Sequence, residues 1–254
     1  MQNTALNAGY QGGSIMNTYA LILIVLIAST MQAATGFGFA IMSIPFLLLL
    51  LDPRDAIQLN ILLAFIISLM MIYKIRHTVK AATLKRLIMG SLLGTLPGIL
   101  IFIFLDVRPL KLLISVLLLI STCLLAAKIR FKESNTKEFL MGVCSGFLTT
   151  SIGMPGPPLM IYYAGTDLDK ATIRSTTVAY FVFINLLSIL MQTFLYGSSA
   201  IVWKSTLISL PFLVLGIVLG QFVFVRLNQQ RMQQLIYLLL FFTSIYLFIT
   251  TIIV

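Results

Sequence analysis

Long apolar runs separated by short polar loops dominate the chain. A membrane-spanning helix needs about 20 apolar residues, and seven runs reach that length, namely 15–34, 56–73, 87–105, 109–127, 172–195, 203–225 and 232–254. Three shorter apolar pieces cover 37–51, 139–152 and 155–164, and their lengths predict half-helices or steeply packed spans. The pattern therefore predicts an all-α polytopic membrane protein with eight to ten membrane segments.

Two parts of the sequence resemble each other, which is typical of transporters built from related halves. Positions that match at a separation of 115 are Asp52, Ala56, Ala64 and Phe65 with Asp167, Ala171, Ala179 and Tyr180, and Gly38 with Gly153. The pair Gly94 and Gly98 matches Gly216 and Gly220 at a separation of 122. We expect two homologous halves, 1–130 and 131–254, each with a broken hairpin segment followed by three spanning helices.

Composition and charge agree with a protein dissolved in lipid. Hydrophobic residues make up 59% of the chain and charged residues 9%, and the mean hydropathy is +1.06, which excludes a soluble domain. The net charge of +10 does not indicate nucleic acid, because the basic residues lie between apolar runs and form no continuous solvated stripe. Cys123 and Cys144 lie inside apolar runs, so no disulfide framework and no Cys-rich metal site is expected.

The distribution of basic residues predicts the orientation, because Lys and Arg are retained in cytoplasmic loops. Five basic residues lie in 74–86 and four in 128–138. If both broken segments are hairpins that return to the face they enter from, 13 basic residues lie inside and four outside. This arrangement inverts the halves relative to each other and places both termini outside.

The candidate site lies at two breaks in apolar segments, Gln32-Ala-Ala-Thr-Gly-Phe-Gly-Phe39 and Thr149-Thr-Ser-Ile-Gly-Met-Pro-Gly-Pro-Pro158. Irregular backbone at membrane depth is tolerated only against protein or a polar cavity. Helices that restart after such breaks direct free N–H groups and positive dipole ends at the break, which favours an anion. The expected ligand-binding residues are Gln32, Thr35, Gly36, Phe37, Gly38 and Phe39, then Thr149, Thr150, Ser151, Gly153, Met154 and Gly156, and Asn185. The alternative is that these glycines only permit close helix crossing.

No other function class has a comparable signal. The sequence contains no nucleophile with a base, paired acids or metal-ligand set, so neither an enzyme nor a cofactor is expected. The seven acids lie at segment ends, the single histidine lies in a basic loop, and Arg174 is expected to snorkel to the interface. An anion channel and a carrier of small carboxylates remain open alternatives to a carrier of another anion.

These motifs resemble the TauE/SafE-type sulfite exporters over nearly the whole chain. The resemblance rests on Gly36-Phe-Gly38 with Pro45, on Asp52-Pro-Arg-Asp-Ala56 and on their second-half counterparts around Gly153. It implies a duplicated permease of the plasma membrane for sulfite or another small sulfur-containing anion, with a homodimer left open. The motif is often richer in glycine in this family. Phe37, Phe39, Met154 and Pro155 instead predict a bulkier, softer site, suited to an organosulfonate or carboxylate as well as to sulfite.

Overall fold

The computed structural model describes residues 2–105, 133–164, 166 and 168–226, with single positions at 109, 112, 116 and 120. Among these residues, side chains are described between 16 and 223, except that of residue 164. Within these residues five helical stretches are long and apolar enough to cross a membrane, Met16–Thr35, Pro53–Thr78, Ala81–Phe104, Lys170–Leu195 and Ala200–Val223. They confirm five of the seven predicted spans, and the predicted spans 109–127 and 232–254 fall outside the continuously described residues.

Every regular element in the described part of the chain is helical. The helices are α1 (Gln2–Thr35), α2 (Phe39–Leu50), α3 (Pro53–Ile75), α4 (Ala81–Phe104), α6 (Asn135–Ile152), α7 (Gly156–Ala164), α8 (Lys170–Leu195) and α9 (Ala200–Arg226), with a 3-10 turn, η1 (Arg76–Thr78). The short predicted pieces correspond to α2, α6 and α7. Helix α6 begins at Asn135 rather than at 139, because its first turn consists of polar residues that an apolar pattern leaves out.

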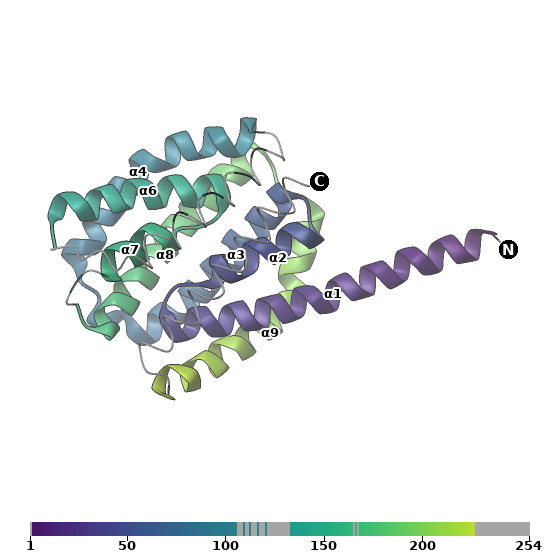
Figure 1. Ribbon diagram of the computed structural model, residues 1–254, viewed down its shortest axis with the longest axis horizontal. Coiled ribbons are helices and arrows are strands. Elements are labelled where there is room, and N and C mark those ends of the chain that lie inside the picture. Colours follow the sequence, from purple (N-terminus) through teal and green to yellow (C-terminus); the bar gives the residue numbers. More distant parts are fainter. Residues whose placement is uncertain are drawn as a thin grey trace.

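The helices form a bundle with one pair of closely packed helices at each of two edges (Figure 1). Helices α4 and α6 lie side by side along one edge, and α1 packs against α9 along the other. Between them α3 packs against α8, with α2 and α7 in the same interior layer. Each edge pair therefore combines a helix from the first part of the chain with one from the second.

Glycines allow the close approach within both edge pairs. A Cβ added to Gly94 on α4 would overlap the carbonyl oxygen of Val143 on α6, and one added to Gly216 on α9 would overlap the hydroxyl of Ser29 on α1. Backbones approach this closely only where side chains are absent, as in other membrane helix pairs. The Gly-x-x-x-Gly motifs of the sequence are therefore packing contacts.

Both breaks lie inside the protein where the sequence predicts them. Gly36 (φ 85°) follows the last residue of α1 and Gly153 (φ 74°) follows that of α6, both in a left-handed conformation that glycine adopts without a steric cost. Their N–H groups donate to the carbonyl oxygens of Gln32 (2.7 Å) and Thr149 (2.8 Å). The chain then restarts as α2 at Phe39 and as α7 at Gly156, so the second restart comes three residues after Gly153 rather than directly after it.

The helix boundaries around the breaks and the starts of α3 and α8 lie 117 residues apart in the two parts, rather than 115. Gly36 and Gly153 both follow the helix before the break (153 minus 36), and α2 and α7 start 117 apart (156 minus 39). The N-cap residues Asp52 of α3 and Asp169 of α8 give the same value (169 minus 52). The sequence comparison matched mostly identical residue types and paired Gly38 with Gly153, whereas a separation of 117 pairs Gly38 with Pro155.

Hydrogen bonds identify the two ends of the bundle. At the basic end, the connection between α3 and α4 meets the starts of α6 and α8, because Lys80 pairs with Glu133 (2.6 Å) and its N–H donates to Thr176 (3.0 Å). Helix α7 returns to this end, since the hydroxyl of Tyr162 donates to Glu138 (3.3 Å) near the start of α6. The predicted cytoplasmic segments, 74–86 and the described part of 128–138, therefore share one end.

The opposite end is held by Arg54, near the start of α3. Its guanidinium donates to the carbonyl oxygens of Phe102 (3.2 Å), Ile103 (2.9 Å) and Leu105 (3.2 Å) at the end of α4. It also donates to the hydroxyl of Tyr196 (2.9 Å) and lies over that ring. The Arg54 guanidinium therefore supplies donors to carbonyl oxygens at the end of α4, which have no N–H donor within the helix.

Two charged side chains lie deeper than the sequence suggested. Glu138 is buried, where it accepts from Thr83 (2.9 Å) and pairs with Arg86. Arg174 is only 9% exposed and donates to the carbonyl oxygen of Ala33 at the end of α1, so the predicted snorkelling is wrong. Apolar patterning along one segment does not reveal the polar groups that a neighbouring helix presents.

Candidate functional site

A small cavity of about 10 Å³ lies between the two helix breaks. Its lining residues come from both breaks and both central helices, namely Gln32, Gly38, Ala40, Ile41, Ala64, Pro155, Gly156 and Phe181. This volume is about that of one water molecule. An anion as large as sulfite would therefore fit this cavity only if the elements that line it, such as the half-helices α2 and α7, moved apart.

The cavity is lined by equivalent positions of the two parts of the chain. Gly38 and Pro155 are 117 residues apart (155 minus 38), as are Ala64 on α3 and Phe181 on α8 (181 minus 64). This separation is the same as that of the helix ends. The cavity therefore lies where corresponding elements of the two parts meet.

Backbone donors at the cavity come mainly from the first break. The first N–H groups of a helix have no acceptor within it, and in α2 the first bond runs from Met42 to the carbonyl oxygen of Gly38 (3.0 Å). The N–H groups of Phe39, Ala40 and Ile41 precede that bond. Helix α7 begins with Gly156 followed by two prolines, which have no N–H. The two breaks thus differ chemically, although the sequence predicted similar roles for them.

Each break packs against the central helix of the other part. A Cβ on Gly36 would lie 2.8 Å from Cγ of Arg174 on α8, and one on Gly153 would lie 3.4 Å from Cγ2 of Ile57 on α3. Arg174 and Ile57 are again 117 residues apart (174 minus 57). Asn60 adds a direct link, because its Nδ2 donates to the carbonyl oxygen of Gly153 (2.8 Å). Movement of α3 relative to α8 would therefore move both breaks.

Helix α8 carries a polar stripe past the cavity. Thr177, Asn185, Ser188 and Gln192 lie at helical spacing on either side of Phe181, and all are buried. The hydroxyl of Ser188 bonds that of Thr150 (2.8 Å), and Gln192 Nε2 donates to the Thr150 carbonyl oxygen (2.8 Å). The stripe therefore contacts the end of α6 just before the second break.

Asn185 lies one helical turn beyond Phe181 and has no exposed surface. Neither its Nδ2 nor its Oδ1 has a hydrogen-bond partner among the described residues. A buried amide without a partner costs about 1–3 kcal/mol, and such groups in a native protein mark an unseen water or ligand, or a functional role. Asn185 therefore keeps unmet hydrogen-bonding capacity, within the described part of the chain, one helical turn from the cavity-lining Phe181.

On α3, the polar side chains near the cavity have hydrogen-bond partners. Asn60 Oδ1 accepts from Ser43 (2.6 Å), and its Nδ2 is bonded to Gly153. Ser68, the counterpart of Asn185 (185 minus 68 is 117), accepts from Gln32 Nε2 (3.0 Å). The unmet hydrogen-bonding capacity near the cavity therefore lies on the α8 side.

The hydroxyls that the sequence proposed as ligands already have partners in this conformation. Thr149 and Ser151 donate to the carbonyl oxygens of Ser145 (2.5 Å) and Phe147 (2.6 Å), four residues back in α6. Thr35 bonds in the same way to Met31 (2.9 Å) and also accepts from the N–H of Phe37 (3.0 Å). These side chains hold the ends of α1 and α6, and their role in ligand binding stays a prediction.

The structure thus brings only part of the predicted set to the cavity. Gln32, Gly38 and Gly156 line it, and Phe37 is in contact range of Gly156. Gly36, Phe39, Gly153 and Met154 are buried in or beside the breaks. The sequence analysis missed Ala40, Ile41, Ala64, Pro155 and Phe181. A repeat separation of 117 would have identified Pro155 and Phe181 as the partners of Gly38 and Ala64.

Comparison with known protein families identifies one family that matches most of the chain. The family described as sulfite exporter TauE/SafE matches residues 21–247. No curated protein and no solved structure gives a significant match. The family match includes both breaks, both central helices and every residue that lines the cavity. The chain therefore belongs to the TauE/SafE sulfite exporter family, whose members are anion transporters of the plasma membrane and not enzymes.

Proposed function

We propose that this protein carries sulfite or a related sulfur-containing oxyanion across the membrane, and that the anion binds between the two helix breaks. The observation that carries the proposal is the cavity lined by Gly38 from one break and by Pro155 and Gly156 from the other. Family membership supports an anion as the substrate. The residues at this cavity are our assignment.

The chemistry of the cavity suits an oxyanion without a cationic side chain. The N–H groups at the start of α2 and the positive end of its dipole favour negative charge. The free amide of Asn185 adds a neutral donor one turn from the cavity. Ile41 and Phe181 form an apolar wall that suits the sulfur lone pair of sulfite or a small organic group better than a fourth charged oxygen. The site therefore favours sulfite and organosulfonates over sulfate.

We further propose that the two halves of the chain are inverted repeats and that the anion crosses by alternating access. Three observations support this proposal. Helix boundaries around the two breaks lie 117 residues apart, and each edge pair, α4 with α6 and α1 with α9, combines one helix from each half. Each break also packs against the central helix of the other half. Inverted repeats with broken helices at the midplane let one half rock against the other around a fixed site. In this proposal, the small cavity corresponds to an intermediate in that cycle.

Counterflow in proteoliposomes tests the transport proposal. Vesicles preloaded with unlabelled sulfite should accumulate labelled sulfite transiently, because a carrier exchanges substrate across the membrane. Acetate should compete weakly and sulfate less than methanesulfonate. Uptake that does not saturate and shows no counterflow would indicate a channel instead. Stronger competition by acetate than by sulfite would identify a carboxylate carrier.

A further inference from the structure

Three polar side chains lie between the cavity and the basic end of the bundle, Arg174 and Thr177 on α8 and Tyr163 on α7. Arg174 and Thr177 are three residues apart and are neighbours on the helix surface. Arg174 precedes the cavity-lining Phe181 by seven residues (181 minus 174), which is about 10 Å along the helix. Tyr163 packs in the same buried cluster as Phe181, and its hydroxyl lies next to Thr177. The three side chains therefore form one group beside the path to the cavity.

All three side chains are buried. Thr177 has no exposed surface, Tyr163 is 5% exposed and Arg174 is 9% exposed. The hydroxyls of Tyr163 and Thr177 are neighbours without the geometry of a hydrogen bond, and neither has another partner among the described residues. A buried hydroxyl without a partner is costly and indicates an unseen water or ligand. Both hydroxyls are therefore able to donate to a bound group.

Arg174 adds a positive charge to this group. Its guanidinium donates to the carbonyl oxygen of Ala33, and its Cγ and Cα are the atoms that a Cβ on Gly36 would meet first. A guanidinium stays charged and carries five N–H donors in a fork that matches an oxyanion. A buried cation within a spanning helix is costly and indicates a functional site. The charge of Arg174 therefore lies directly beside the first break.

The described carboxylates near this end have partners of their own. Glu138 accepts from the hydroxyl of Tyr162, whose ring lies beside that of Tyr163, and it is paired with Arg86. Asp169 accepts from backbone N–H groups at the exposed start of α8. These pairings limit the negative charge that an anion would meet here.

The equivalent positions in the other half have different chemistry. At the separation of 117, Arg174, Thr177 and Tyr163 correspond to Ile57, Asn60 and Phe46. Ile57 and Phe46 carry neither a charge nor a hydroxyl, and both atoms of the Asn60 amide are bonded. The polar group is therefore a feature of the second half, whereas the cavity itself is lined by both halves.

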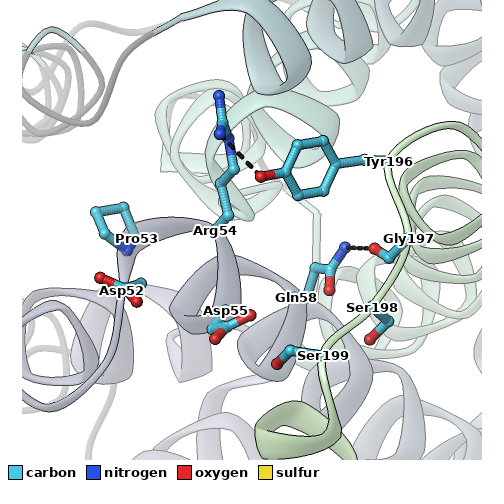
Figure 2. A pocket seen from close by; sticks show the side chains of 9 residues that line it. All are labelled: Asp52, Pro53, Arg54, Asp55, Gln58, Tyr196, Gly197, Ser198 and Ser199. Carbon is cyan, nitrogen blue, oxygen red and sulfur yellow. Dashed lines mark hydrogen bonds between the residues drawn. The ribbon is translucent and has the colours of Figure 1, made fainter.

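In the described part of the chain, the opposite end of the bundle is less suited to an anion. A cavity of about 510 Å³ lies there, and Arg54, Asp52 and Asp55 contribute to its lining (Figure 2). Figure 2 shows the Arg54 guanidinium directed toward Tyr196, and its N–H groups donate to that hydroxyl and to carbonyl oxygens at the end of α4. The two carboxylates would repel an anion. The described features that favour an anion therefore lie on the side of the basic end.

We propose that Arg174, Thr177 and Tyr163 form a second anion site, which binds the transported anion between the basic end and the cavity. This inference rests on the proposed function, because the ligand is the same small oxyanion. One guanidinium and two hydroxyls supply charge-assisted hydrogen bonds to its oxygens. The anion reaches these groups when α7 moves away from α8. The transport path is consequently asymmetric, with a cationic site on one side of the cavity only among the described residues.

Sulfite titration of the purified full-length protein by isothermal titration calorimetry tests the site. Tyr163→Phe and Thr177→Val each remove one hydroxyl and keep the shape of the side chain. Each should weaken sulfite binding about tenfold or more, as expected for the loss of a hydrogen bond to a charged group. The ligand-free melting temperature should be unchanged or higher, because each variant removes a buried hydroxyl without a described partner.

Tyr180→Phe is the matched control. The Tyr180 hydroxyl is also buried without a partner among the described residues, but it lies next to Ser91 and Ser145, toward α4 and α6. This variant should melt like the other two and bind sulfite with wild-type affinity. A loss of affinity equal to that of Tyr163→Phe would show that the effect is not specific to the site and would contradict it.

The charge is tested by Arg174→Lys and Arg174→Gln. Arg174→Lys should keep most of the sulfite affinity, and Arg174→Gln should lose more of it than either hydroxyl variant. If Arg174→Gln does not fold, the two hydroxyl variants still decide. Wild-type affinity in both Tyr163→Phe and Thr177→Val would overturn this site alone, whereas absence of sulfite binding to the wild-type protein would overturn the proposed function with it.

Discussion

At the scale of single residues, Asn185 is a position where stability of the fold and binding of a ligand favour different side chains. In the described part of the chain its amide has no hydrogen-bond partner and no exposed surface. A protein selected for stability alone would replace it with an apolar residue of similar volume, because an unsatisfied buried amide is costly. We infer that the amide is retained for a bound anion.

Replacing Asn185 with leucine should therefore stabilise the ligand-free protein and impair transport. We expect the free energy of unfolding to rise by about 1–3 kcal/mol, since the uncompensated desolvation cost disappears. Sulfite counterflow should fall at least tenfold. The measurements are thermal or denaturant unfolding in detergent and counterflow in proteoliposomes.

Asn60→Leu is the matched control, because Asn60 lies on the other central helix and both atoms of its amide are bonded. This variant should lose stability by a similar amount, since it leaves the Gly153 carbonyl oxygen without its donor. If Asn185→Leu is destabilised as much as Asn60→Leu, the free amide of Asn185 has an unseen structural partner and our assignment is wrong.

At the scale of helices, the edge pairs depend on glycine. Residues 90, 94 and 98 of α4 lie against the backbone of α6, and residues 216 and 220 of α9 lie against that of α1. These contacts involve backbone atoms, which cannot move aside as a flexible side chain can. The packing therefore constrains these positions independently of the substrate.

Gly94→Leu should consequently lower the free energy of unfolding by about 1–3 kcal/mol or more, the usual cost of overpacking. The yield of folded protein should fall as well. Size-exclusion chromatography and thermal unfolding measure the effect. Leu93→Ala is the control, because Leu93 is 58% exposed on the same helix and should have little influence. A Gly94→Leu protein that is fully stable but does not bind sulfite would assign α4 to the binding site instead.

The helices could be predicted from the sequence to a greater extent than the site. Spans such as 56–73 follow from apolar length alone, and Gly36 and Gly153 were identified because glycine interrupts an otherwise apolar run. The apolar lining, including Phe181, could not be identified, since a buried wall residue has the same pattern as a core residue. The burial of Glu138 and Arg174 depends on partners from other helices, which no single segment encodes.

At the scale of the whole molecule, the proposed inversion places the loop before α9 outside the cell and the α3–α4 connection inside. Single cysteines at Ala200 and His77, both exposed, report these locations in a protein whose own Cys123 and Cys144 are replaced by alanine. A membrane-impermeant maleimide should label Ala200→Cys in intact cells and His77→Cys only after permeabilisation. The reverse labelling pattern would contradict the predicted orientation, and labelling of both in intact cells would contradict the topology.

The central claim is that the anion binds between the two breaks, and Gly156 provides the most direct test. A Cβ at Gly156 would lie 3.8–4.0 Å from Ile41, Phe181 and Phe37, which are ordinary contacts, and the position has no positive φ. Gly156→Ala thus adds a methyl group next to the cavity without strain. The ligand-free melting temperature should be unchanged or slightly higher, since alanine restricts the unfolded chain by about 0.4–1 kcal/mol.

The decisive measurement is a sulfite titration of wild-type and Gly156→Ala protein by isothermal titration calorimetry, with ligand-free melting recorded for both. We predict saturable sulfite binding to the wild-type protein and at least tenfold weaker binding to a Gly156→Ala variant that melts at or above the wild-type temperature. Equal sulfite affinity in the two proteins would show that the anion binds elsewhere and would contradict the account.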